Sequence, residues 1–118
     1  MKTKLLVKYL GIGIVSFSLT CTHINAQNRD FGDLNRYAQE NKDITISHKT
    51  VKVVFMGNSI TEGWVNTHPA FFTDNGYVGR GISGQTSYQF LLRFREDVIK
   101  LSPSLVVINA GTNDVAEN

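Results

Sequence analysis

A chain of 118 residues, of which 42% are hydrophobic and 19% are charged, has room for at most one globular domain. Its formal net charge of +2 comes from the first residues, because Lys2, Lys4 and Lys8 precede any acidic residue, and after residue 26 nine Lys and Arg stand against ten Asp and Glu. This near-neutral balance argues against a nucleic-acid partner or an anionic membrane surface.

The first 26 residues have the pattern of a secretory signal peptide. Three lysines flank the start of an apolar run over residues 9–19, and residues 24–26 fit a cleavage site. The apolar run is shorter than the about 20 residues that a transmembrane helix needs. We therefore expect export to the periplasm or the extracellular space, with no transmembrane segment in the mature chain. Lipidation of Cys21, the only cysteine, is the alternative.

Residues 27–50 are polar and predict one short helical segment. The apolar residues that recur there at helical spacing are Phe31, Leu34, Tyr37 and Ala38. The pattern ends near residues 41–42, and we expect this helix to cover part of the sheet formed by residues 51–118. His48, just before the first strand, fits a surface role better than a catalytic one.

Residues 51–56 are β-branched and apolar apart from one lysine, the composition of a strand covered on both faces. Gly57 and Asn58 end this strand with residues that tolerate strained dihedral angles. Ser59 then lies at the carboxyl end of a parallel strand, where open α/β sheets place their ligands, so its hydroxyl is a candidate nucleophile. Ser59 and Glu62 also match a capping box, and a helix cap is the alternative role.

Residues 64–75 contain an aromatic cluster and a second short helix. The aromatic residues of this stretch are Trp64, Phe71 and Phe72. Pro69 suits the first turn of a helix. We expect the rings to pack in the core, and the alternative for Trp64 is substrate binding by stacking on a sugar. His68 is a candidate base for Ser59, although no neighbouring residue orients it.

A second strand, turn and helix occupy residues 77–82, 83–86 and 87–101. The apolar stripe of the helix consists of Leu91, Phe94, Val98 and Leu101. Thr86 and Gln89 form a capping-box pattern at its start. A third strand over residues 104–110 follows. Strands that alternate with helices predict right-handed crossovers and a parallel sheet.

The residue types that an ester hydrolase needs follow these three strands. Ser59 comes after the first strand, Gly84 after the second and Asn113 after the third, so all three fall at the same edge of a parallel sheet. Ester hydrolysis requires a hydroxyl nucleophile and hydrogen-bond donors about 3 Å from the oxygen on which charge develops. The N–H of a glycine can approach a substrate closely, and an asparagine amide donates without carrying charge.

A dinucleotide-binding domain is a weaker alternative. Residues 79–84 (GRGISG) match the glycine fingerprint of dinucleotide-binding folds. The strand before the fingerprint is short and interrupted by glycine, and no acidic residue ends the following strand, where residues 109–111 are Asn-Ala-Gly. The context that gives the fingerprint its meaning is therefore missing.

Three motifs together resemble the SGNH hydrolases, the GDSL-like lipase/acylhydrolase family. They are residues 57–61 (GNSIT), 81–86 (GISGQT) and 111–114 (GTND), which are similar in order and spacing to the first three sequence blocks of that family. The resemblance covers residues 51–118. It implies a flavodoxin-like three-layer α/β/α fold with a parallel sheet of strand order 2-1-3-4-5, truncated here after the third strand.

The resemblance also implies roles for single residues. Ser59 matches the family's nucleophile, and its own N–H, the N–H of Gly84 and the side chain of Asn113 match the oxyanion hole. The first block usually reads Gly-Asp-Ser, so Asn58 departs from the pattern, and we expect it to tune the turn rather than to abolish activity. No metal or organic cofactor is implied. Export without a long apolar lid is similar to the small-ester members, such as acetylesterases that act on sugars or polysaccharides.

The family's catalytic Asp-x-x-His block does not occur in this chain. We therefore expect the chain to be the N-terminal part of a longer hydrolase, with little or no turnover on its own. Without later strands, one flank of the third strand would be an exposed apolar edge. A non-catalytic carbohydrate-binding or structural module on the same fold is the remaining alternative, because a fold does not dictate function.

Overall fold

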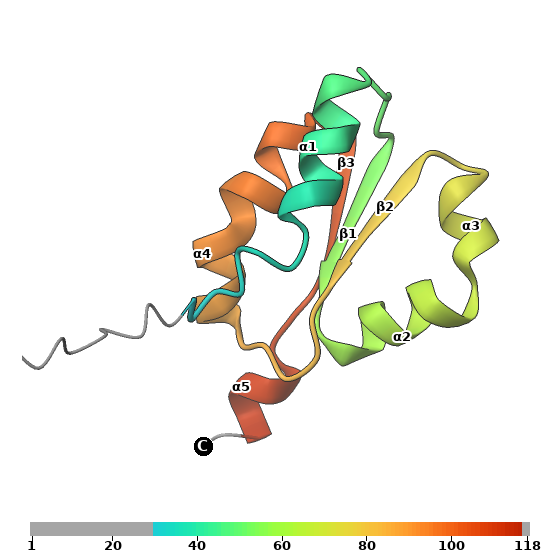
Figure 1. Cartoon of the computed structure of the whole chain (residues 1–118). Helices are drawn as coiled ribbons and strands as arrows, with labels where there is room; N and C mark the ends of the chain where they lie inside the picture. The colour runs from blue at the N-terminus through green and yellow to red at the C-terminus, as the bar shows by residue number, and fades with distance from the viewer. Residues whose placement is uncertain (1–29, 117–118) are drawn as a thin grey trace, which may run out of the picture.

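Three parallel strands, β1 (Val53–Gly57), β2 (Tyr77–Gly81) and β3 (Leu105–Asn109), form one sheet in the order β2-β1-β3 (Figure 1). The computed structural model describes residues 30–116, so the expected signal peptide and Cys21 lie outside the described residues. The helices are α1 (Ala38–Ile46), α2 (Ser59–Thr67), α3 (Pro69–Thr73), α4 (Ser87–Asp97), the 3₁₀-helix η1 (Ile99–Leu101) and α5 (Thr112–Ala116).

The strands are in register at their carboxyl ends. Gly57, the last residue of β1, pairs with Gly81 of β2 and with Asn109 of β3. The predicted parallel sheet is confirmed, and the order of these three strands is the one that the resemblance implies. Because the three strands end at the same level, the turns that follow them begin side by side.

Helices cover both faces of the sheet, which gives three layers (Figure 1). The helices α1, α4 and η1 pack together on one face, and α2 and α3 cover the other. Val54 and Met56 of β1 point to the first face and are 0% and 1% exposed. The other buried residues of this core are Ile44, Val51, Val78, Phe90, Val98 and Leu101. Each such side chain contributes about 1.5–3 kcal/mol of burial free energy.

An aromatic cluster fills the space between the sheet and the second pair of helices. Phe55 of β1 lies 5.3 Å from the ring of Trp64 and 5.4 Å from that of Phe72, both edge to face. Trp64 stacks on Phe71 at 4.9 Å. Phe72 is 3% exposed, as expected for the core, whereas Trp64 and Phe71 are each 39% exposed and pack there only in part. Aromatic pairs of this kind add about 0.5–1.5 kcal/mol each beyond their burial.

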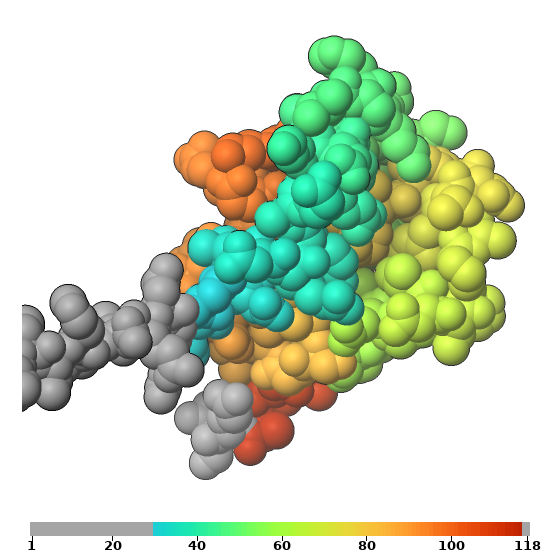
Figure 2. Space-filling view, in the orientation of Figure 1, coloured from blue at the N-terminus to red at the C-terminus, as the bar shows by residue number. Residues whose placement is uncertain are grey.

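The first helix begins and ends later than the sequence pattern predicts. Residues 31–37 form turns, because the Asp30 carboxylate accepts hydrogen bonds from the backbone (2.9 Å) and side-chain (3.1 Å) nitrogens of Asn35. Gln89 of α4 donates to the Phe31 carbonyl (2.9 Å) and holds this segment in place. Figure 2 shows the segment and α1, in cyan to green, crossing the front of the molecule between α4 and the α2–α3 pair.

The predicted apolar stripe is confirmed at Phe94, Val98 and Leu101, which pack in the core, but it is wrong at Leu91. Leu91 is 76% exposed, whereas Phe90, Arg93 and Asp97 are buried. The two charged residues are tolerated there because the Arg93 guanidinium pairs with the Asp97 carboxylate at 2.9 Å. The capping box predicted at the start of this helix is present.

The two outer edges of the sheet are treated differently. At the β2 edge, the Tyr37 hydroxyl donates to the Gly81 carbonyl, and Arg80 Nη1 donates to the Gly79 carbonyl (2.7 Å). These bonds satisfy carbonyls that would otherwise be open to another strand. No strand among residues 30–116 pairs with the outer edge of β3. The apolar side chains of Leu105, Val107 and Ile108 in this strand are 58%, 39% and 55% exposed.

Two glycines allow the first turn of α2 to lie directly on the strand ends. A Cβ at Gly81 would lie 2.2 Å from the backbone nitrogen of Glu62, and a Cβ at Gly57 would lie 2.0 Å from Thr61 Oγ1. Gly81→Ala is therefore expected to lower the free energy of unfolding by about 1–3 kcal/mol, because the added methyl group meets backbone rather than a mobile side chain. Urea unfolding of the two proteins measures this difference.

Gly63→Ala is the matched control for this prediction. Gly63 lies inside α2, and a Cβ there would meet nothing within 4 Å. This replacement is expected to stabilise the protein by about 0.5–1 kcal/mol, the ordinary gain for alanine over glycine in a helix. Equal stabilities of the Gly81→Ala and Gly63→Ala proteins would show that α2 does not depend on the close approach.

Candidate active site

Ser59 is the first residue of α2 and is exposed at the carboxyl edge of β1. The helix cap is Asn58, whose side-chain oxygen accepts a hydrogen bond from the Ile60 N–H (3.1 Å) and which is only 1% exposed. The capping alternative for Ser59 is therefore wrong, because Asn58 caps the helix. Among residues 30–116, the Ser59 hydroxyl has no hydrogen-bond partner.

Gly84 lies in the turn between β2 and α4. Its φ angle of +77° is in the left-handed region, which glycine adopts without strain. A Cβ at this position would meet nothing within 4 Å, so the space around the residue is open. The turn therefore presents backbone to the edge at which Ser59 lies.

Asn113 is the second residue of α5 and is half-buried. Its side-chain nitrogen donates to the Gln85 carbonyl at 2.9 Å, which joins the third turn to the second. Because a backbone carbonyl can only accept, this bond fixes which end of the amide faces Gln85. The structure thus brings the turns of Gly84 and Asn113 into direct contact.

Two carboxylates add further links between the turns. Glu62 of α2 accepts hydrogen bonds from the backbone N–H (2.9 Å) and the hydroxyl of Ser83. Asp114 of α5 accepts from the backbone N–H (3.0 Å) and the hydroxyl of Ser87. The Ser83 hydroxyl, followed by the Arg36 guanidinium at 3.0 Å, lowers the pKa of Glu62, and the Ser87 hydroxyl lowers the pKa of Asp114.

The sign of these shifts gives the pH dependence of the links. A carboxyl group whose pKa is lower in the folded state stabilises that state above its unfolded pKa, about 4 for Glu and Asp. The contribution is lost as the pH falls through the lower, folded-state pKa of each group. The links made by the Glu62 and Asp114 carboxylates therefore contribute their full stability at neutral pH and weaken in acid.

Exchanging one serine at a time separates the two links. Ser83→Ala is expected to raise the pKa of Glu62 toward its ordinary value while leaving that of Asp114 where it is, because it removes the largest cause of the Glu62 shift only. Ser87→Ala should do the reverse. Carbon-detected NMR titration of the two carboxyl groups measures both. A Glu62 pKa that does not move in Ser83→Ala would contradict this assignment.

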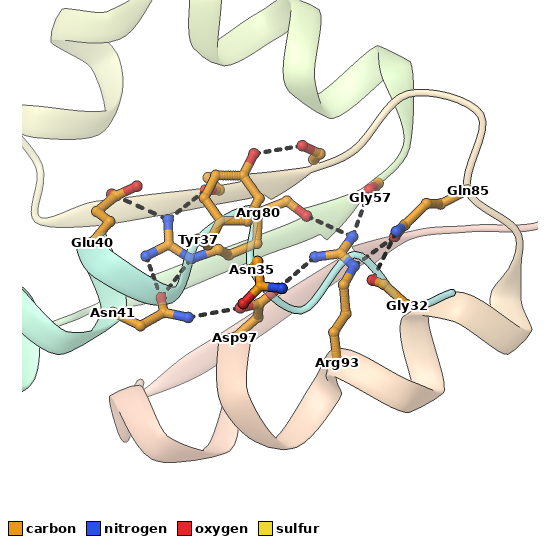
Figure 3. Close-up of polar contacts among 12 residues, drawn as sticks. Gly32, Asn35, Tyr37, Glu40, Asn41, Gly57, Arg80, Gln85, Arg93 and Asp97 are labelled. Carbon is orange, nitrogen blue, oxygen red and sulfur yellow. Dashed lines mark hydrogen bonds and ion pairs between the residues drawn. The ribbon is translucent and has the colours of Figure 1, made fainter. Parts of the chain in front are cut away.

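Sequence patterns did not predict the buried arginine that contacts the strand ends (Figure 3). This residue, Arg93, is 0% exposed. Its Nη2 donates to the carbonyls of Gly57 (3.1 Å) and Arg80 (3.0 Å), and its Nε donates to the side-chain oxygen of Gln85 (2.6 Å). One guanidinium therefore connects the end of β1, the end of β2 and the turn that contains Gly84.

A second buried arginine completes the network. Arg80 is also 0% exposed and donates through Nε (2.9 Å) and Nη2 (2.6 Å) to the side-chain oxygen of Asn41. Its Nη1 lies 3.1 Å from the Glu40 carboxylate, and Asn41 in turn donates to Asp97 at 2.7 Å. Within residues 30–116, every buried side-chain nitrogen and oxygen has a hydrogen-bond partner. The spacing of Phe90, Arg93 and Asp97 on one helix face is the signal that could have revealed the network.

Both histidines of the described residues lie away from Ser59. His68 follows the last residue of α2, nine residues on, which is about 13 Å along a helix, and its Nδ1 lies 2.8 Å from the Thr67 hydroxyl. His48 precedes β1, at the opposite end of the sheet from Ser59. Trp64 packs against Phe55 and Phe71 in the aromatic cluster.

The dinucleotide-binding alternative does not fit the observed backbone. Gly79 and Gly81 lie inside β2, whereas the fingerprint requires its first glycines in the turn after the strand. Both are explained by packing, since a Cβ at Gly79 would lie 2.1 Å from Val65 Cγ2 and one at Gly81 would meet α2.

Two kinds of feature are absent from residues 30–116. In that range, no helix is both long and apolar enough to span a bilayer. The same residues contain no group of three or more His, Cys, Asp and Glu side chains that could hold a metal ion.

The parallel sheet and the three linked turns define an α/β protein of flavodoxin-like strand order. Residues 55–118 match the model of the GDSL-like lipase/acylhydrolase family. Because this match spans more than half of the chain, the chain belongs to that family. No curated protein matches the sequence.

Two crystal structures from Bacteroides are similar to this chain. One is a Bacteroides fragilis protein provisionally described as an acylhydrolase, with 67% identity over 73% of this chain and a TM-score of 0.67. The other is a GDSL-like lipase of Bacteroides thetaiotaomicron, with 71% identity over 74% of this chain and a TM-score of 0.67. The matches span 42% and 43% of the lengths of those two proteins.

Proposed function

We propose that this chain supplies the nucleophile and the oxyanion-stabilising groups of a serine ester hydrolase. The observation that supports the proposal is the position of Ser59, Gly84 and Asn113, which follow three strands whose carboxyl ends are in register, in a member of the GDSL-like lipase/acylhydrolase family. The hydrogen bond between Asn113 and the Gln85 carbonyl is a second, local support, because it holds two of the three turns together.

Each residue has a distinct role in the proposed reaction. Ser59 is the nucleophile, and its position at the start of α2 leaves its own N–H without an intrahelical partner. That N–H, the N–H of Gly84 and the Asn113 amide donate to the oxygen on which negative charge develops. Asn113 gives one amide hydrogen to Gln85, which leaves the second for the substrate.

The general base is a residue outside residues 30–116. His68 and His48 are the histidines of the described residues, and neither lies at the end of the sheet that carries Ser59. A serine hydroxyl is a weak nucleophile without an adjacent base. The aligned relatives extend well beyond the matched region, which leaves room for such a residue in a protein of their length.

The proposed reaction is a two-step acyl transfer. The base removes the Ser59 proton, Oγ attacks the ester carbonyl carbon, and the tetrahedral intermediate collapses with loss of the alcohol, which takes that proton. Water then attacks the acyl-enzyme, with its proton passing to the base, and the carboxylic acid leaves while Ser59 recovers its hydrogen. The same donors stabilise the oxyanion in both steps.

We place the substrate among small esters, with acetylated carbohydrates as the first class to test. The amino-terminal signal pattern supports export. Acetyl esters of polysaccharides are found outside the cytoplasm, so an exported esterase would meet them. Trp64 is 39% exposed, so part of its ring is available to a sugar even though the rest packs on Phe71.

The test is hydrolysis of p-nitrophenyl acetate and acetylated xylo-oligosaccharides by the protein at its natural full length. We expect turnover that disappears in Ser59→Ala and persists in Ser47→Ala, which removes an exposed hydroxyl beyond the end of α1. Binding of the oligosaccharide without any hydrolysis would overturn the proposal and favour a non-catalytic binding module.

A further inference from the structure

Gln85 is a polar residue that the structure buries next to the candidate oxyanion hole. It directly follows Gly84 in the chain and is 3% exposed. Figure 3 shows its side chain between Gly32 and Arg93. Burying an amide without partners is costly, so its contacts should account for its position. The residue belongs to the second sequence motif, yet neither the nucleophile nor the proposed oxyanion donors explain why it is a glutamine.

The side chain of Gln85 is held at both ends. Its nitrogen donates to the Gly32 carbonyl at 3.0 Å, and its oxygen accepts from Arg93 Nε at 2.6 Å. An arginine can only donate and a carbonyl can only accept, so the amide has one possible orientation. The turn after Gly84 is thereby fixed to the segment before α1 on one side and to α4 on the other.

The backbone of Gln85 touches the third turn. Its carbonyl accepts the hydrogen bond from the Asn113 amide at 2.9 Å. Its own N–H points back into the turn, toward the Ile82 carbonyl at 3.4 Å. One residue is therefore covalently joined to Gly84 and hydrogen-bonded to Asn113.

Arg93 extends the same restraint to the nucleophile turn. Its Nη2 donates to the Gly57 carbonyl (3.1 Å), two residues before Ser59, while its Nε holds Gln85. The Arg93 guanidinium is in turn fixed by Asp97 at 2.9 Å. A planar guanidinium with several bonds of fixed geometry is well suited to set the distance between two turns.

We propose that Gln85 is a positioning residue, which with Arg93 sets the relative placement of the Gly84 N–H, the Asn113 amide and Ser59. The inference rests on the proposed esterase function. Gln85 touches no substrate in this account and acts only through the two donors. Donors that are displaced by a fraction of an ångström stabilise the transition state less while substrate binding is little changed.

The kinetic test replaces Gln85 by methionine, which has a similar volume and neither hydrogen bond. In the full-length enzyme, kcat is expected to fall about 10- to 100-fold with KM nearly unchanged. Gln85→Glu keeps an acceptor for Arg93 and loses the donor to Gly32, so its kcat should lie between those of the wild type and Gln85→Met. If Gln85→Met does not fold, Gln85→Glu takes its place.

Val51→Ala is the control. Val51 is 3% exposed in the core just before the amino-terminal end of β1, at the opposite end of the sheet from the three turns. This variant should lose stability as Gln85→Met does while keeping its kcat. Equal losses of kcat in Val51→Ala and Gln85→Met would overturn the proposal, because they would reduce Gln85 to a general stabilising residue.

A double-mutant cycle tests the route through Asn113. Gln85→Met should lower kcat much less when Asn113 is already alanine, because one of the donors it positions is gone. If the effects of the two replacements on kcat multiplied as independent effects do, Gln85 would not act through Asn113.

A readout without turnover separates this proposal from the esterase function. The NMR signals of the Asn113 side-chain amide should shift in Gln85→Met and stay in place in Val51→Ala. If the full-length protein has no esterase activity but its Asn113 signals shift in this way, the proposed function is refuted while the positioning role of Gln85 stands. Unchanged Asn113 signals in Gln85→Met would refute the positioning.

Discussion

Replacing Asn113 with alanine is expected to lower kcat by about 10²–10³-fold, the loss that follows removal of one oxyanion donor. The amide of Asn113 is fixed by its hydrogen bond to the Gln85 carbonyl at 2.9 Å, so its second hydrogen is already oriented before substrate arrives. A donor held in place costs no reorganisation when charge develops. KM should change little, because this interaction strengthens only in the transition state. Steady-state hydrolysis of p-nitrophenyl acetate by the full-length protein measures both constants.

Asn75→Ala is the control for that loss. Asn75 also donates one hydrogen bond of 2.9 Å, to the Phe71 carbonyl, but it follows α3 at the amino-terminal end of β2, away from the three turns. Its replacement removes the same kind of bond and should leave kcat at the wild-type value. A raised KM with unchanged kcat in Asn113→Ala would assign Asn113 to ground-state binding instead.

Replacing Asp97 with alanine is expected to cost about 3–5 kcal/mol of unfolding free energy, because it leaves the Arg93 charge buried without its carboxylate. Asp97 is 1% exposed and accepts from Arg93 (2.9 Å) and Asn41 (2.7 Å), so both partners lose a bond at once. The effect should appear in urea unfolding as a lower midpoint with a similar slope.

The adjacent residue provides the control for this second prediction. Glu96 forms the same kind of pair one turn from its cation, with Lys100 at 2.7 Å, but both side chains are largely open to solvent. Glu96→Ala should cost no more than about 0.5 kcal/mol, the usual contribution of an exposed pair on a helix. Similar losses for the two variants would show that burial does not make the Arg93–Asp97 pair special.

Local sequence patterns predicted the sheet and the three turns correctly. The strand that ends at Gly57 and the strand that ends before Gly111 could both be predicted from short stretches of consecutive residues. The same holds for the capping box of Thr86 and Gln89, which the structure contains. Where neighbouring residues alone determine the backbone conformation, the sequence is enough to predict it.

Long-range contacts decided the features that the sequence patterns missed. Asn41 bonds to Arg80 across 39 residues and to Asp97 across 56, so the residues around Asn41 in the sequence do not identify its partners. The exposure of Leu91 and the burial of Arg93 in α4 follow from the same network. The late start of α1 combines a local cause, the bonds of Asn35 to Asp30, with a long-range one, the bond from Gln89 of α4 to the Phe31 carbonyl. A hydrophobic stripe predicts which face of a helix is buried only when charged residues lack partners there.

The most direct test of the account is the site of covalent labelling by a fluorophosphonate in the full-length protein. Such reagents phosphonylate serine nucleophiles that a base and an oxyanion hole activate, because the serine oxygen attacks phosphorus and fluoride leaves. We therefore expect one labelled peptide, modified at Ser59, and a much slower reaction in Asn113→Ala. Mass spectrometry of the digested protein locates the modification. Labelling at another serine, or none under conditions that label a known serine esterase, would contradict the assignment of Ser59 as the nucleophile.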